Sequence, residues 1–154
     1  MQGYQSLKQA GKELKMWNQI GETYRMYHFA LYNISPIQAG IQSLHATIDY
    51  SIKYGGSIKY KKWAKHDKTV IILSGGGSID MQEREKELED HGIEYASFLE
   101  PDLNNSISAI AFLVPESIYN FDETEYRDLN GFSCVDSSQF KFYRYLKSFK
   151  LAAN

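Results

Sequence analysis

The sequence predicts an α/β protein with a small mixed sheet of four strands flanked by helices, and with an additional helix near each end of the chain. Three observations predict it. Short aromatic or β-branched runs alternate with longer segments of helical periodicity, and glycine or proline marks most of the boundaries. The chain of 154 residues contains no internal repeat. We therefore expect a single domain.

The first expected strand covers residues 23–33, where aromatic residues alternate with smaller ones. One face would carry Tyr27, Phe29 and Leu31, and the other Met26, His28 and Ala30. A buried central strand tolerates two apolar faces.

A helix is expected next, over residues 35–55, because Ser35 is a good N-cap and Pro36 suits a first helical turn. Large apolar residues recur on it at three- and four-residue spacing and predict a buried stripe: Ile37, Ile41, Leu44, Ile48 and Ile52. The same spacing gives a polar stripe beside it: Gln38, Gln42, His45 and Asp49. We expect this polar stripe at the edge of the core, where a cleft can form.

The following segments complete the expected sheet. Strands are predicted over residues 69–73, 93–102 and 107–115, and a charged helix over 81–92 precedes the second of these. The basic segment at 57–68 is expected to be a solvated loop or a short helix, with a phosphate-contacting patch as the alternative. The SGGGS sequence at 74–78 is expected to be a flexible turn, with an anion site as the alternative.

The two ends of the chain have amphipathic patterns. The N-terminal pattern is carried by Leu7, Ala10, Leu14 and Trp17. After a polar, irregular bridge at 116–136, a C-terminal helix is expected to face inward with Phe142, Tyr145, Leu146 and Phe149. Its outward side would carry Lys141, Arg144, Lys147 and Lys150.

Composition excludes several classes of protein. The net charge of -2 and the pI near 6.1 argue against a general polyanion binder. Because Cys134 is the only cysteine, one chain cannot form an internal disulfide or a cysteine-based zinc cage. The N-terminal segment, with Lys8, Lys12 and Lys15 spread along it, resembles neither a signal peptide nor a membrane span. A cytoplasmic protein without a membrane partner is expected.

Common catalytic motifs are absent. The chain has no HExxH or GxSxG sequence, and nothing in the spacing of His28, His45, His66 and His91 argues for a metal site. We expect neither a metal nor a cofactor. Two stretches remain as candidates: the polar stripe that contains His45, and the turn EPDLNNS at residues 100–106.

Together these two stretches resemble the type 2 peptidyl-tRNA hydrolases, in particular a divergent bacterial and phage branch with a Glu-Pro-Asp loop. ALYNISPIQAGIQSLHATIDY resembles the family's signature, with its Gln-x-x-His-Ala element at residues 42–46. TVIIL, the charged helix, GIEYASFLEPD and SAIAFLVP keep the family's order of elements. The likeness covers residues 24–115, which would form the hydrolase-like core, with the helices at 1–22 and 136–151 as appendages.

The resemblance implies cleavage of the ester that joins a peptide to the 3′ end of tRNA. It implies His45 and Asp102 as catalytic residues and Gln42 and Ser106 as substrate-binding residues, while the same loop adds Asn105 as a candidate. The family usually has a lysine where this chain has Gln38, and the loop before the last strand is shorter here. Glutamine offers only a neutral dipole to a phosphate or a developing oxyanion, which typically reduces the rate on the order of a hundredfold or more.

Three hypotheses follow. The first is an ester hydrolase in which Asp102 orients His45 or positions water and Gln42 orients the substrate. The second is a binding module that has lost the chemistry and binds RNA ends, a nucleotide or a protein. The third is a structural or regulatory homodimer that uses its tyrosine-rich exterior.

Overall fold

The computed structural model describes residues 22–124 and 138–152, and its elements follow one another along the chain as the sequence predicts for the sheet and its main helices. The first half contains β1 (Tyr24–Leu31), α2 (Pro36–Tyr54), α3 (Ile58–Lys62), the π-helical turn η1 (Trp63–Asp67) and β2 (Val70–Gly76). The second half contains α4 (Ser78–Asp90), β3 (Tyr95–Glu100), the 3-10 turn η2 (Pro101–Leu103), β4 (Ser106–Pro115), α5 (Glu116–Tyr119) and α6 (Ser138–Lys147).

The four strands form one mixed sheet in the order β2-β1-β4-β3. β1 is parallel to β2, and the connection between them contains α2 and α3. β4 is antiparallel to both of its neighbours, β1 and β3. The segment after α6 protects the outer edge of β2, because Leu151 pairs with Leu73 and the Ala152 N–H donates to the Ile72 carbonyl at 2.8 Å. The predicted mixed four-stranded α/β fold is therefore confirmed at this level.

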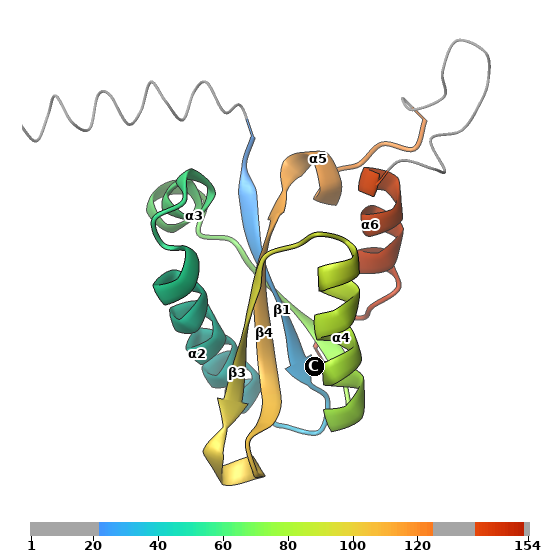
Figure 1. Cartoon of the computed structure of the whole chain (residues 1–154). Helices are drawn as coiled ribbons and strands as arrows, with labels where there is room; N and C mark the ends of the chain where they lie inside the picture. Colours follow the sequence, from blue (N-terminus) through green and yellow to red (C-terminus); the bar gives the residue numbers. More distant parts are fainter. Residues whose placement is uncertain (1–21, 125–137, 153–154) are drawn as a thin grey trace, which may run out of the picture.

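Helices cover both faces of the sheet, so that the molecule has three layers (Figure 1). α4 and α6 lie over one face, and α2 and α3 lie over the other. Successive side chains of the central strands point to the two faces in turn, as expected from the pleat of a strand. On β4, Ile110, Phe112 and Val114 belong to the α4 and α6 side, whereas Ala109, Ala111 and Leu113 belong to the α2 side. The predicted alternation of β1 is confirmed in the same way, with Phe29 on the first side and Met26 on the second.

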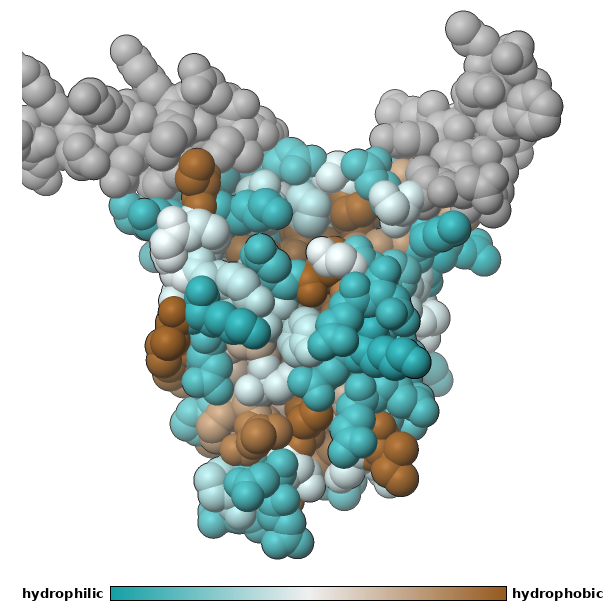
Figure 2. Space-filling model, in the orientation of Figure 1, coloured by the Kyte–Doolittle hydropathy of each residue, from teal (hydrophilic) through white to brown (hydrophobic). Residues whose placement is uncertain are grey.

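The prediction for the apolar stripe of α2 is wrong. Its five residues Ile37, Ile41, Leu44, Ile48 and Ile52 are exposed by 77, 47, 58, 47 and 79 %. The helix instead buries Ala39, Ser43, Ala46 and Tyr50. Three of these four side chains are small and face the alanines of β3 and β4, and the large apolar side chains of the stripe are left outside. Figure 2 shows apolar side chains projecting at the left margin, where α2 lies.

The other elements agree with the sequence more closely. The C-terminal helix buries Phe142 and Leu146, as predicted, and exposes Lys141, Arg144 and Lys147. The basic segment forms a short helix, α3, followed by the π-helical turn, which is the second form expected for it. α5, in the predicted irregular bridge, was not expected. The N-terminal amphipathic pattern at 1–21 lies outside the described residues.

Candidate functional site

A recess with a volume of about 360 Å³ lies between the start of α2 and the turn after β3. Two segments far apart in the sequence meet there, the first turns of α2 and the turn after β3. The lining residues are Leu31, Asn33, Ile34, Gln38, Gln42, Glu100, Asp102 and Leu103. Apolar side chains thus alternate with amides and carboxylates, the composition that is typical of a ligand site.

Gln42 is the best-ordered polar group of the recess, because both ends of its amide are bound. Its Oε1 accepts a hydrogen bond of 2.7 Å from the Ser108 hydroxyl, and its Nε2 donates to Glu100 Oε2 at 2.8 Å. These bonds fix which end of the amide is the donor. An amide nitrogen carries two protons, so Gln42 retains a second N–H for a ligand.

Glu100 occupies the centre of this network. One carboxylate oxygen accepts from Gln42, and the other accepts from the backbone N–H of Asp102 at 3.3 Å. Glu100 therefore caps the η2 turn, and Pro101 starts the turn where a missing N–H is tolerated. As a result, the side chain of Asp102 is exposed at the border of the recess.

Glu100 and Ser108 were not predicted as parts of the site. A signal for Ser108 was present, because it is the only polar residue in the apolar run at 107–115, and a buried hydroxyl requires a partner. Glu100 was noticed only as a member of the turn. Its contact with Gln42 depends on how closely α2 approaches β3, which no local pattern reveals.

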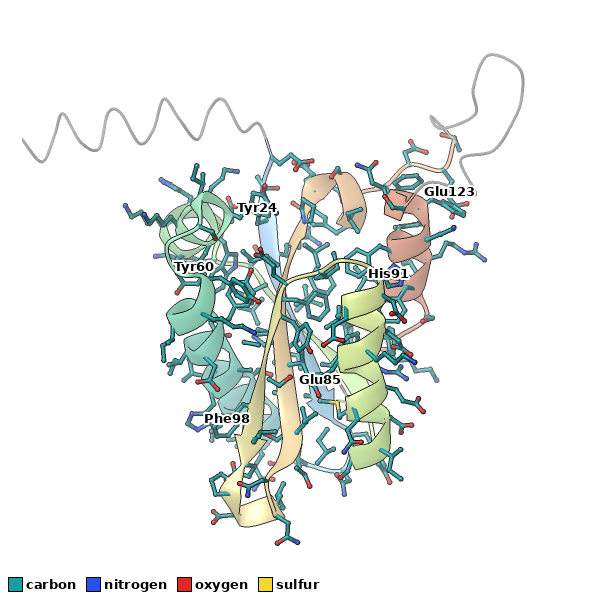
Figure 3. All side chains as sticks on the ribbon, viewed as in Figure 1. Tyr24, Tyr60, Glu85, His91, Phe98 and Glu123 are labelled. Carbon is teal, nitrogen blue, oxygen red and sulfur yellow. The ribbon has the colours of Figure 1, made fainter. Side chains whose placement is uncertain are left out.

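His45 lies one turn beyond Gln42 on α2 and does not line the recess. Its ring stacks on Phe98, with a centroid distance of 4.6 Å and an interplanar angle of 26°. Figure 3 labels Phe98 toward the lower end of β3, beside α2. The structure therefore brings Gln38, Gln42 and Asp102 to one recess and places His45 beside it, against an aromatic ring.

The two remaining candidates, Asn105 and Ser106, do not line the recess either. Asn105 has a left-handed backbone, with φ at 56°, and its N–H donates to the Glu100 carbonyl at 3.0 Å. Ser106 begins β4 and pairs with Glu100 in the sheet. Both residues close the turn that holds Glu100 in position, which is a structural contribution to the site.

The charge of the recess is negative. Glu100 and Asp102 contribute carboxylates, and none of the described residues that line it is basic. The lysines of α3, which belong to the basic segment with the phosphate-contacting patch as its alternative role, lie beyond the opposite end of α2 (Figure 1). Because α2 has 19 residues, that end is about 28 Å away. Within one chain these lysines do not surround the recess.

The glycine-rich SGGGS sequence does not form the flexible turn that was predicted, because Ser74–Gly76 continue β2 and Ser78 begins α4. The anion site considered as the alternative is filled by the protein's own chain. The Gly77 N–H at the start of α4 donates to Asp80 Oδ2 at 2.8 Å, so a carboxylate already occupies the position that an anion would take. Gly76 has φ at +92°, a conformation that favours glycine. A side chain at Gly75 would collide with Met81, since its Cβ would lie 2.3 Å from the sulfur.

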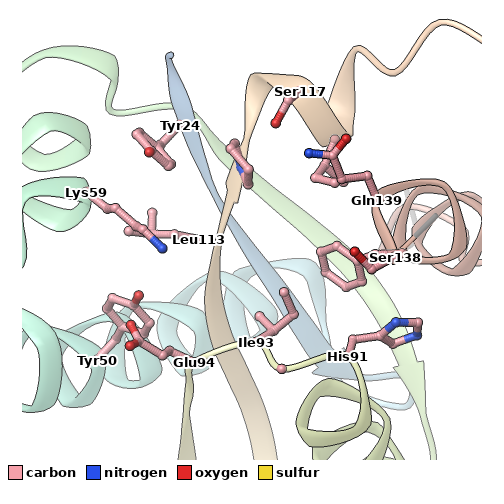
Figure 4. A pocket seen from close by; sticks show the side chains of 14 residues that line it. Tyr24, Tyr50, Lys59, His91, Ile93, Glu94, Leu113, Ser117, Ser138 and Gln139 are labelled. Atoms are coloured by element: carbon pink, nitrogen blue, oxygen red, sulfur yellow. The ribbon is translucent and has the colours of Figure 1, made fainter. Parts of the chain in front are cut away.

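A second hollow, with a volume of about 290 Å³, lies at the opposite end of the sheet (Figure 4). Tyr50 and Lys59 from α2 and α3 lie on one side of it, and Ser138 and Gln139 from α6 lie on the other. Residue 138 directly follows a part of the chain outside the described residues. We therefore base no site on this hollow.

His28 forms a separate polar contact beneath α2 and is almost completely buried. The Thr47 hydroxyl lies 2.9 Å from the Ser43 carbonyl and 2.7 Å from His28 Nε2, so that it links the ring to the backbone of α2. Burial lowers the pKa of His28 from 6.5 to about 4, so the ring is neutral at pH 7.

Comparisons with known proteins leave the family open. No model of a known protein family matches this chain, and a search of curated proteins finds no match. In residues 22–124 and 138–152 there is no group of three or more histidine, cysteine, aspartate or glutamate side chains placed to hold a metal ion. Within the same ranges, no helix combines the length and the apolar character needed to cross a membrane.

Proposed function

We propose that the protein is a peptidyl-tRNA hydrolase-like enzyme that cleaves the ester between a peptide and the 3′ end of tRNA. The observation that carries the proposal is the hydrogen bond between Gln42 and Glu100. It joins the two stretches on which the resemblance to the type 2 family rests, at the border of one recess. The order of strands and helices around this recess supports the same assignment, and the family-like fold is part of the proposal.

The recess offers suitable groups for such a substrate. The second N–H of Gln42 can donate to the ester carbonyl, and the exposed Asp102 carboxylate can accept a proton from an attacking water. Gln38, Asn33 and the carboxylates can bind ribose hydroxyls and the substrate amide. The apolar side of the recess, with Leu31 and Leu103, can contact the adenine or a peptide side chain.

Asp102→Asn tests this proposal, because it removes the carboxylate and keeps the size of an exposed side chain. Release of the peptide from peptidyl-tRNA should fall by about 10²–10⁴, the usual contribution of a positioned base. Asp90→Asn, at the exposed end of α4, is the matched control and should keep the rate of the unmodified protein. If the unmodified protein releases no more peptide than Asp102→Asn, ester cleavage is rejected.

His45→Gln distinguishes two forms of the proposal. If His45 transfers a proton in the same step as Asp102, His45→Gln should reduce the rate as strongly as Asp102→Asn does. The double variant should then be no slower than either single variant. If His45 only packs on Phe98, His45→Gln should change the rate far less.

A binding module without chemistry is the second candidate, and one specific observation favours it. Both oxygens of Glu100 and the oxygen of Gln42 already have partners within the protein, and His45 stacks on Phe98 beside the recess. Such a module would bind a neutral or amine-bearing group, because the lining is acidic. Adenosine carrying a 3′-linked amino acid through a stable amide is the probe, and inorganic phosphate is the control. Side-chain amide resonances of Gln42 and Gln38 should shift with the probe only.

A further inference from the structure

The outer face of α2 is the largest feature of the molecule that the proposed function leaves unexplained. We define it as the α2 stripe, formed by Ile37, Ile41, Leu44, Ile48 and Ile52. With the exposed fractions given above, the stripe presents on the order of 500 Å² of apolar surface, near the upper end of the roughly 300–600 Å² that the largest patch of a monomer exposes. Exposed apolar patches of this size are often interaction sites.

The spacing of the stripe is nearly the same in both directions. Steps of four and three residues lead from Ile37 through Ile41 to Leu44, and steps of four lead on through Ile48 to Ile52. When two such helices lie antiparallel, Ile37 of one faces Ile52 of the other and Ile41 faces Ile48. The two Leu44 side chains then flank the two-fold axis. A surface that is complementary to itself is what a two-fold interface requires.

The charge of α2 indicates a protein partner. Its only Asp, Glu, Lys or Arg residues are Asp49 and Lys53. Lys53 Nζ lies over the rings of Tyr54 and Tyr95, at 5.3 and 5.8 Å from their centroids, which directs it away from the stripe. Helices that bind lipid surfaces or nucleic acids carry several lysines or arginines beside the contact. The central part of a protein interface, in contrast, is depleted of charge.

The N-terminal segment is a less suitable occupant. Its connection to β1 is held against the η1 region, because the Tyr24 N–H donates to Asp67 Oδ2 at 2.8 Å and Lys62 donates to the Glu22 carbonyl. The segment therefore joins the structure between the sheet and α3, whereas the α2 stripe faces away from the sheet. Its Lys8, Lys12 and Lys15 would meet one carboxylate, Asp49, beside the stripe.

We propose that two copies of this chain form a dimer by antiparallel pairing of their α2 stripes. Pairing buries the stripe on both copies, on the order of 1,000 Å² in total, which reaches the lower limit expected for a specific interface. It also brings the partner's α3, with its lysines, toward the end of the molecule that holds the recess, where one chain alone offers only acidic groups. This last consequence rests on the proposed function, but the pairing is tested without any activity.

Sedimentation of the full chain tests the pairing. The unmodified protein should be a dimer at about 100 µM, and Leu44→Glu should shift it to a monomer, because two carboxylates would meet at the two-fold axis. Ile79→Glu, on α4, is the matched control: Ile79 is 76 % exposed and lies outside the stripe, so this variant should stay dimeric. A monomeric unmodified protein, or a dimer that survives Leu44→Glu, would overturn the proposal.

Disulfide trapping tests the register independently. In a Cys134→Ser background, Leu44→Cys should give a covalent dimer under mild oxidation, because the two side chains flank the axis. Ile79→Cys in the same background should not. Equal cross-linking of the two variants, or none with Leu44→Cys, contradicts antiparallel pairing. Circular dichroism of each variant confirms that the helices are retained.

Discussion

The two faces of the sheet are packed by different means. Toward α4 and α6, aromatic rings fill the space: Phe112 lies 5.2 Å from Phe29 and 6.4 Å from Phe142 between ring centroids. Toward α2, Ala46 of the helix and Ala109 and Ala111 of β4 lie in one cluster with larger side chains such as Met26 and Tyr50. The first face is filled mainly by aromatic rings, whereas the second, here called the close face, combines large side chains with alanines and buried polar groups.

This difference explains where the candidate site lies. A helix that is close to the sheet brings short polar side chains into contact, so that Ser108 reaches Gln42 and Thr47 reaches His28. A layer of aromatic rings would separate such groups. The close face therefore contains the polar network, and the same geometry leaves the large residues of α2 exposed.

The largest effect is expected on the aromatic face. Phe112→Ala removes a completely buried ring and should reduce the free energy of unfolding by about 3–5 kcal/mol. Chemical denaturation at a fixed protein concentration measures the change. Ile79→Ala, at an exposed position of α4, is the control and should change it by less than about 0.5 kcal/mol. A loss below about 1 kcal/mol for Phe112→Ala would show that this face collapses around the missing ring.

On the close face, stability should depend on pH through His28. The unfolded chain binds a proton near pH 6.5, whereas burial lowers the pKa of the folded His28 to about 4. The contribution of neutral His28 to the free energy of unfolding is therefore fully present above pH 6.5. It is lost as the pH decreases toward 4, by about 3 kcal/mol in total. His28→Leu removes this contribution, so the free energy of unfolding should become less dependent on pH between 4 and 6.5. Parallel profiles for the two proteins would argue against a buried neutral ring.

A smaller effect on the free energy of unfolding is expected from a larger side chain between α2 and the sheet. Ala46 is fully buried between α2 and the sheet, and Ala46→Leu should cost about 1–3 kcal/mol, because the helix must move outward. Denaturation of the variant measures this cost. Gly40→Ala adds a methyl group on the exposed side of the same helix, where an added Cβ meets nothing within 4 Å, and should be neutral or stabilising by up to about 1 kcal/mol. If Ala46→Leu leaves the free energy of unfolding unchanged, α2 is not packed tightly on the sheet at this position.

Local patterns in the sequence were sufficient for most of the fold. Alternation in β1 and β4, the cap and proline at the start of α2, and the periodicity of α6 each depend on neighbours within a few residues. Part of the site was predictable for the same reason, since Gln42 and Asp102 stand in short polar stretches that contrast with their surroundings. The contact of Gln42 with Glu100 and Ser108 was not, because it joins residues 58 and 66 positions apart.

The sequence by itself determined where the four strands and the longer helices α2, α4 and α6 lie, because backbone preference and side-chain periodicity act over short distances. Only the tertiary structure decided which side of α2 is buried. The stripe of large apolar residues and the stripe of mostly small residues are both compatible with a helix, and the choice depended on the alanines of β3 and β4 against which the helix packs. Close packing of small surfaces excluded the larger stripe, and this exclusion created both the polar recess and the exposed face of α2.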